Sequence, residues 1–245
     1  MVRIMPVSDS PWAPTGFGTN TRNIASIFAK EGHTVGYGGC QNPEHIAAWE
    51  TPWPLGQEET KVSMEMLPMM HPGEEKFGEK SFPKWVEGFK PELVFTHLDI
   101  QMFDYVTHHK QPPMINIPLV DDKGTWQTQQ QFVRLSRKAF KMGQKPRFKI
   151  GSIIPMDGQP SIPGWLRTLD QVDFPVAMSK YGQQVLLDDF NGYKSTYIPH
   201  GVDTEFFKPR DVPKPSDAFV VGCVARNQHR KNIPRLMRAF KIFVE

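Results

Sequence analysis

The stretch YIPHGVDTEFFKPRDVPKPSDAFVVGCVARNQHRK, from Tyr197 to Lys231, predicts where one domain ends and another begins. It combines a strand end and a turn, a Pro-rich connector, and a new strand over 218–224 that leads into a basic loop. A helix is expected near Asn232, and the sequence stops at Glu245. A strand, a loop and a helix cannot make a core alone. We therefore expect a complete domain over 1–209, a connector over 210–217 and an incomplete domain over 218–245.

The composition is that of a soluble globular protein, with 39% apolar and 22% charged residues among 245. No run approaches the ~18 apolar residues of a membrane helix, and the first ten residues lack the apolar core of a signal peptide. The only cysteines are Cys40 and Cys223, which disfavours a disulfide framework and fits a reducing compartment. These features predict a cytoplasmic protein.

Apolar runs alternate with helical patterns along the first domain, which predicts an α/β fold with a Rossmann-like open parallel sheet flanked by helices. In such sheets ligands bind beyond the carboxyl ends of the strands. Helices are expected over 81–89 and 100–106, after a Ser179 cap, and after a cap at Thr19 or Asn20 that places Ile24, Ile27 and Phe28 on the core face. Strands are expected over 2–7, 33–38, 62–67, 92–96, 114–120, 150–154, 176–178 and 196–198.

A glycine-containing loop, Thr15-Gly16-Phe17-Gly18, follows the first expected strand. Glycines allow a backbone to approach a ligand, and the start of the following helix favours a negative group there. The dinucleotide pattern G-x-G-x-x-G is not met, because Thr21 occupies the third glycine position. Ligand contact and simple turn chemistry are equal alternatives for this loop.

A basic loop after the strand at 218–224 carries Arg226 and Lys231. Two cations near a helix N-terminus suit a diphosphate group, and the alternative is an ordinary solvated loop.

Asp157 lies in the loop Pro-Met-Asp-Gly after the strand at 150–154, where a carboxylate can orient a hydroxyl or act in acid–base chemistry. The alternative is an aspartate in a turn. Neither the adjacent Asp121 and Asp122 nor the adjacent His108 and His109 has metal-ligand spacing, so no metal is expected.

Several segments together resemble glycosyltransferases of family four, also called group 1, which have the GT-B fold. Tyr197 to Pro209 resembles the family's IPNGVDxxxFxP segment, and Val224 to Asn232 resembles its GRLxxxKG loop. Lys30 to Val35 resembles its xxGHxV junction, Ser179 to Tyr181 resembles a helix start, and Thr15 to Gly18 occupies the place of its glycine-rich loop.

The resemblance implies two Rossmann-like domains facing a cleft, the second of them truncated here. It implies transfer of a hexose, with retention, from a nucleotide-diphosphate sugar to a glycan, lipid or small-molecule acceptor, with no metal or other cofactor. Arg226 and Lys231 would bind the donor diphosphate. The family's usual histidine after a central strand has no clear counterpart, so Asp157 is aligned there as the catalytic residue. The residues implied to bind the sugar or the acceptor are Gly16, Phe17, Gly18, Ser179, His200 and Gly201.

The family's Glu-x7-Glu motif, which holds the donor sugar, lies beyond the last residue of this sequence. The 245 residues are therefore expected to be a piece of a longer protein, with negligible activity alone. Two alternatives stay open, a sugar phosphorylase or synthase of the same fold and a non-catalytic domain that binds a sugar or a lipid headgroup.

The segment 123–149 contains eight basic residues and no acidic one. A helix there with Arg134, Arg137, Lys138 and Lys141 suggests peripheral contact with an anionic membrane at its inner face, or with a phosphorylated acceptor. The alternative is a solvated helix packed through its apolar stripe, which includes Phe132. Nucleic-acid binding is not expected, because the segment lacks interleaved exposed aromatic residues and a known motif.

Overall fold

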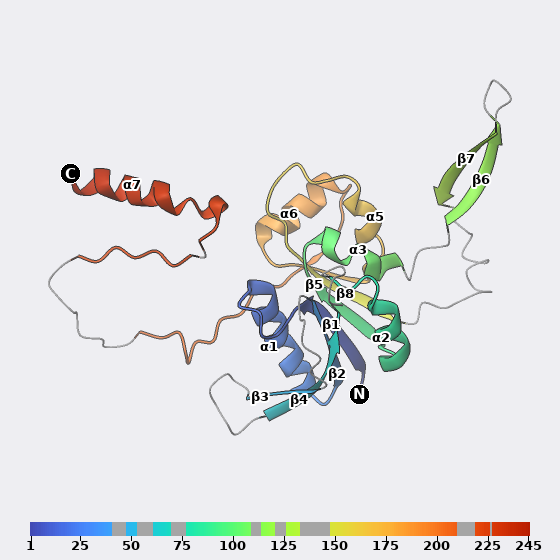
Figure 1. Cartoon of the computed structure of the whole chain (residues 1–245), viewed down its shortest axis with the longest axis horizontal. Helices are drawn as coiled ribbons and strands as arrows, with labels where there is room; N and C mark the ends of the chain where they lie inside the picture. Colours follow the sequence, from blue (N-terminus) through green and yellow to red (C-terminus); the bar gives the residue numbers. More distant parts are fainter. Residues whose placement is uncertain are drawn as a thin grey trace. The chain divides into compact units, whose positions relative to one another are not determined.

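The computed structural model describes residues 1–40, 48–52, 61–69, 77–108, 114–120, 126–132, 148–209, 219–225 and 227–245. The chain divides into two units, which we call unit 1, Met1–Gly201, and unit 2, Val202–Glu245. Figure 1 labels most of the helices and strands of unit 1 and the helix of unit 2.

Unit 1 is built on an eight-stranded sheet with the order β10-β9-β8-β5-β1-β2-β4-β3 (Figure 1). The first seven strands are parallel, and β3 pairs antiparallel with β4 at one edge. This arrangement confirms the predicted α/β fold with a Rossmann-like parallel sheet. The strands are β1 (Arg3–Asp9), β2 (Thr34–Cys40), β3 (Ala48–Pro52), β4 (Lys61–Pro68), β5 (Leu93–His97), β8 (Lys149–Ile154), β9 (Phe174–Ala177) and β10 (Thr196–Tyr197).

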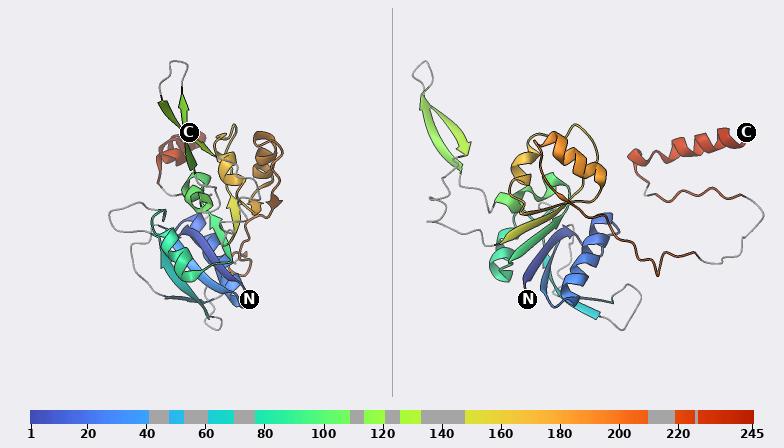
Figure 2. Two further views of the ribbon diagram at one scale, coloured as in Figure 1. Left: turned by 90° about the vertical axis from the view of Figure 1, so that its right-hand side faces the viewer. Right: turned by 180° about the vertical axis from the view of Figure 1, so that it is seen from behind.

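The helices of unit 1 follow individual strands, and the cores they form lie on both faces of the sheet. One hydrophobic cluster joins β1, β5 and β8 to neighbouring helices, and it contains the fully buried Phe82 and Phe103. A second cluster joins α1 to β2 and β4 through Ala25, Tyr37 and Met64. Figures 1 and 2 show these helices from several sides. The helices are α1 (Gly16–Lys30), α2 (Phe82–Phe89), α3 (Ile100–His108), α5 (Trp165–Leu169) and α6 (Lys180–Asp189).

Helix α1 begins earlier than the sequence predicted. Thr15 is its N-cap, with an extended backbone and a side-chain oxygen that accepts a hydrogen bond from the Gly18 amide at 3.0 Å. The predicted cap at Thr19 or Asn20 is therefore wrong, and the glycine-containing segment forms the first helical turn. Gly32, with φ +84°, follows the end of the helix, where glycine was predicted.

The face that α1 buries agrees only in part with the prediction, because Phe28 is half-buried against the second cluster. The buried residues of the helix are Gly18, Thr21, Ala25 and Ser26, whereas Ile27 is 44% exposed. The small side chains let the helix approach the sheet closely, because a Cβ added at Gly18 would lie 2.6 Å from the Ser10 carbonyl oxygen. Close packing therefore favours small residues on the side of the helix that faces the sheet.

Two strands, β6 (Met114–Val120) and β7 (Trp126–Phe132), form a separate antiparallel sheet. The first was predicted, but β7, β3 and α5 were not. Phe132 was expected on the apolar face of a basic helix and instead ends β7. The basic residues Arg134, Arg137, Lys138 and Lys141 lie outside the described residues.

Unit 2 contains a short 3-10 turn, η1 (His229–Lys231), followed by helix α7 (Ile233–Val244). The helix after Asn232 is confirmed, whereas the predicted strand over 218–224 is wrong over residues 219–224, where the described backbone forms no strand. Within the described parts of the chain this apolar segment has no strand to pair with, and pairing is what completes a strand's hydrogen bonds. None of the described helices combines the length and the apolar character needed to cross a membrane.

Candidate functional site

The carboxyl ends of the parallel strands in unit 1 carry a series of polar side chains. Asp9 ends β1 and His97 ends β5, and these two strands are direct neighbours with Ser8 paired to His97. Asp157, Ser179 and His200 follow β8, β9 and β10 in turn. Because parallel strands end at the same edge of a sheet, the topology gathers these residues at the edge where open α/β sheets bind ligands.

His97 is the most deeply buried of these groups, with no exposed surface. Its carbonyl oxygen accepts a hydrogen bond from Ser8 Oγ at 2.8 Å, and its Nδ1 lies 3.1 Å from Thr21 Oγ1. The ring of Phe17 packs edge-on at a centroid distance of 5.0 Å. Among the described residues no group hydrogen-bonds to Nε2. A buried polar atom without a partner is uncommon in a folded protein, and a ligand that binds at this edge can supply one.

Burial lowers the pKa of His97 to about 3, and the nearby His200 lowers it further in the same direction. Burial also lowers the pKa of His200. The two rings lie with centroids 5.1 Å apart, and both are neutral at pH 7. The pair therefore offers hydrogen bonds without a net charge.

Asn20 joins His200 to the first turn of α1. Its Nδ2 atom lies 2.9 Å from the Gly16 carbonyl oxygen and 3.2 Å from His200 Nδ1. The segment after β10 is therefore tied to the segment after β1, although 180 residues separate the two in sequence.

The two glycines of the first turn have different surroundings. A Cβ at Gly18 would meet the Ser10 and Ala13 carbonyl oxygens at 2.6 and 3.1 Å, so packing within the chain explains this glycine. A Cβ at Gly16 would meet nothing within 4 Å. Of the two glycines, only Gly16 has free space beside its backbone that a ligand could occupy.

Three carboxylates lie near the ends of β1, β5 and β8. Asp9 is buried and accepts a hydrogen bond from Thr15 Oγ1 at 2.7 Å. The pKa of Asp99 is raised first by burial and then by the negative charges of Asp157 and Asp9. Asp157 itself is exposed. In the described part of the chain no group of three or more His, Cys, Asp and Glu side chains could hold a metal ion.

Ser179 is the N-cap of α6, as predicted, and its hydroxyl oxygen accepts from the Gly182 amide at 2.9 Å. The hydroxyl is thus already engaged in holding the helix start. Gly201, the last residue of unit 1, is exposed, and no atom lies within 4 Å of a Cβ added there.

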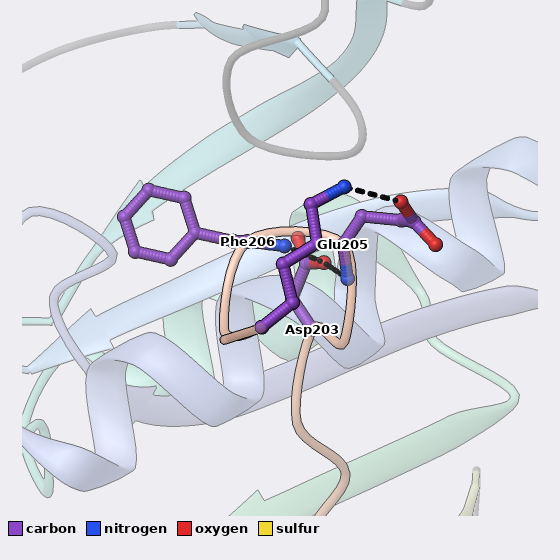
Figure 3. Close-up of polar contacts among 4 residues, drawn as sticks. Asp203, Glu205 and Phe206 are labelled. Atoms are coloured by element: carbon purple, nitrogen blue, oxygen red, sulfur yellow. Dashed lines mark hydrogen bonds and ion pairs between the residues drawn. The ribbon is translucent and has the colours of Figure 1, made fainter. Parts of the chain in front are cut away.

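In unit 2 the Val-Asp-Thr-Glu-Phe-Phe segment folds as a turn around Asp203 (Figure 3). Asp203 Oδ1 accepts hydrogen bonds from the Glu205 and Phe206 amides, both at 3.0 Å. This is the arrangement of an Asx turn, which explains the aspartate without a ligand. Lys231 ends η1 and is exposed, and Arg226 lies outside the described residues.

Sequence reasoning missed His97, Ser8 and the contacts of Asn20 and Thr21. It found no clear histidine after a central strand of the first domain, but His97 is the last residue of β5, in the middle of the sheet. The strand at 92–96 was correctly predicted, and the polar residue directly after it was the available signal. The hydroxyls of Ser8 and Thr21 had no such signal, because their roles depend on contacts between distant segments.

Known proteins resemble this chain only distantly. No protein-family model matches the sequence, and no curated protein matches it. Fifteen solved chains match the structure. One is a sucrose-phosphate synthase from Thermosynechococcus elongatus, with 10% identity and a TM-score of 0.42 over 84% of this chain and 91% of that one. A similarity this distant says nothing about what this chain does.

Proposed function

We propose that the chain is part of a glycosyltransferase that moves a hexose from a nucleotide-diphosphate sugar to a hydroxyl-bearing acceptor with retention of configuration. The observation that carries the proposal is the polar edge of unit 1, where buried, neutral His97 lies beside His200 and the first turn of α1. Of the glycosyltransferase-like segments, Thr15 to Gly18 and Ser179 to Tyr181 lie at this edge, Tyr197 to Pro209 begins in β10 and continues into unit 2, and Val224 to Asn232 lies in unit 2.

The chemistry of the edge supports a neutral, hydroxyl-bearing ligand. A sugar hydroxyl both donates and accepts hydrogen bonds, and neutral imidazoles provide both functions. The lowered pKa values of His97 and His200 keep both rings neutral at pH 7. In the proposal Gly16, Phe17, Gly18, Ser179, His200 and Gly201 belong to the sugar- or acceptor-binding surface. Gly18 and Ser179 act by shaping the backbone, because their own contacts are within the chain.

The proposed role of Lys231 and Arg226 is to bind the diphosphate of the donor and stabilise the charge that develops on the leaving group. Asp157 is proposed to act at the reacting centre, where its exposed carboxylate can orient a hydroxyl. The proposal needs no metal or other cofactor. Contact of the basic segment 123–149 with an anionic membrane stays a prediction.

Calorimetric titration of the longest protein that the gene encodes with UDP, GDP and ADP, each also as its glucose conjugate, tests the proposal. One nucleotide series should bind, and Lys231→Ala should weaken it about tenfold or more, since a hydrogen bond to a charged group contributes about 1.5–3 kcal/mol. Lys241→Ala is the matched control, because Lys241 is an exposed lysine of the same unit that pairs with Glu245 at 3.4 Å. It should leave binding unchanged.

The outcomes separate the candidate functions. Binding of one series with loss in Lys231→Ala supports the transferase. Equal weakening by Lys231→Ala and Lys241→Ala indicates a non-specific attraction of anions to a basic surface. Failure of every nucleotide and conjugate to bind contradicts the proposal and favours a non-catalytic sugar-binding domain.

A further inference from the structure

A chain of buried hydroxyls connects β1, α1 and β5. Tyr37 of β2 also interacts with Ser8, but its hydroxyl donates to the Asp9 carbonyl oxygen at 2.9 Å. Ser8 Oγ lies 2.8 Å from the His97 carbonyl oxygen, which can only accept, so Ser8 donates its single proton there. Thr21 Oγ1 lies 3.0 Å from Ser8 Oγ, and because the Ser8 proton is already used, Thr21 must donate. The Thr21 hydroxyl then has no proton left for His97.

The tautomer of His97 follows from this chain. Its Nδ1 lies 3.1 Å from Thr21 Oγ1, and the bond between them requires the proton on Nδ1. The other nitrogen, Nε2, is then unprotonated and can only accept. No described residue donates to it, and the ring is completely buried. The lowered pKa, about 3, is consistent with a ring that carries a single proton at pH 7.

Asn20 fixes the tautomer of His200, which is the opposite of the tautomer of His97. Its Nδ2 lies 2.9 Å from the Gly16 carbonyl oxygen, which requires the amide NH2 group, rather than the amide oxygen, at that position. The same NH2 group lies 3.2 Å from His200 Nδ1. Because an amide NH2 only donates, His200 Nδ1 accepts, and the proton of the neutral ring is on Nε2.

We propose that Asn20 and Thr21, adjacent residues of α1, are positioning residues that hold His200 and His97 in opposite tautomers, so that the pair presents a donor at His200 Nε2 and an acceptor at His97 Nε2. Two rings of the same chemistry thereby gain different roles. His200 is exposed and His97 is buried, so the two rings also differ in their access to solvent.

A hydroxyl group suits such a pair, because it accepts one hydrogen bond and donates another. This ligand class rests on the proposed function, whereas the tautomers are properties of the chain without a ligand. The two ideas can therefore fail separately.

Nitrogen NMR of ¹⁵N-histidine-labelled protein at pH 7, without ligand, tests the tautomers. Protonated and unprotonated ring nitrogens resonate far apart, and spectra of His97→Gln and His200→Gln assign the two rings. The wild type should show the proton on Nδ1 of His97 and on Nε2 of His200. Thr21→Val should give His97 a measurable population protonated on Nε2 and leave His200 unchanged. Asn20→Asp should move a proton onto His200 Nδ1, because a carboxylate only accepts, and leave His97 unchanged.

Two further variants separate positioning from general loosening of the core. Thr21→Ser keeps the hydroxyl and should preserve the tautomer of His97. Thr96→Val removes a buried hydroxyl of β5 that donates to Ser152 at 2.8 Å, outside the chain of hydroxyls, and should also preserve it. Identical tautomers for His97 and His200 in the wild type would overturn the proposal. An equal change in Thr21→Val and Thr96→Val would do the same. Should Thr21→Val fail to fold, the wild type and Thr21→Ser still decide.

Discussion

The polar edge of unit 1 and the chain of unit 2 each contain segments that resemble glycosyltransferase motifs. In unit 1 these segments are held by contacts between residues far apart in sequence, and in unit 2 by contacts between near neighbours. His97 is fixed by β1 and α1, which lie 89 and 76 residues away in sequence. Asp203 accepts hydrogen bonds from residues two, three and four positions ahead, and α7 has no buried residue among those described. A motif identifies a segment, whereas long-range packing gives its side chains a defined chemistry. Only unit 1 allows that chemistry to be argued from distances.

The largest expected difference between the units is in core stability. Phe103 is fully buried in unit 1, and Phe103→Ala should lower the free energy of unfolding by about 3–5 kcal/mol. Phe240 of α7 is 42% exposed, and Phe240→Ala should change it by less than about 0.5 kcal/mol. Urea unfolding followed by circular dichroism measures both. Similar losses in the two variants would contradict the distinction between the units.

A smaller effect tests how tightly α1 packs at the edge of unit 1. Gly18→Ala places a Cβ 2.6 Å from a backbone oxygen and should destabilise unit 1 by roughly 1–3 kcal/mol. Gly16→Ala, two residues earlier with no atom within 4 Å, should be neutral or stabilising by up to about 1 kcal/mol. Thermal unfolding of the two variants compares them directly. Equal destabilisation would show that the first turn is constrained throughout.

The smallest expected effect compares two side-chain caps. Ser179→Ala removes the N-cap of α6 in unit 1 and should cost about 1 kcal/mol. Asp203→Ala removes the side-chain hydrogen bonds of the exposed turn in unit 2 and should lower the free energy of unfolding by less than about 0.5 kcal/mol. Urea unfolding measures both changes as shifts of the midpoint, provided that the slope of the unfolding free energy against urea concentration stays constant. A larger loss from Asp203→Ala would indicate that this turn supports more than its own residues.

The sequence predicted those parts of the fold that depend on local pattern. Eight strands of unit 1, namely those of the large sheet except β3 together with β6, could be predicted because apolar runs signal them directly. The Ser179 cap could be predicted because serine is a common capping residue. The start of α1 could not, because Thr15 competes with Thr19 and Asn20 as a cap and Gly18 allows a close approach that no pattern reveals. The polar strand β7, with the sequence WQTQQQF, also lacks an apolar signal.

The apolar run FVVGCV at 219–224 gives the opposite lesson, since it has the composition of a strand and forms none among the described residues. A strand exists only with a partner, which composition does not supply. The candidate site likewise depends on partners that composition does not supply. The residue types at the strand ends could be found, but the pairing of His97 with His200 depends on segments 103 residues apart in sequence (200 − 97).

A buried, neutral His97 ring is the central feature of the candidate site, and an NMR pH titration of its ring resonances measures this. The folded protein should show no His97 midpoint near pH 6.5 and a pKa of about 3, whereas the unfolded chain should titrate near 6.5. The folded-state pKa is the lower of the two, so the unfolded state binds the proton first as the pH falls. The His97 contribution therefore costs stability progressively from about pH 6.5 down to about pH 3, and His97→Asn should remove that part of the acid sensitivity. A folded-state midpoint near 6.5 would contradict the account, because His97 would then be an ordinary solvated histidine.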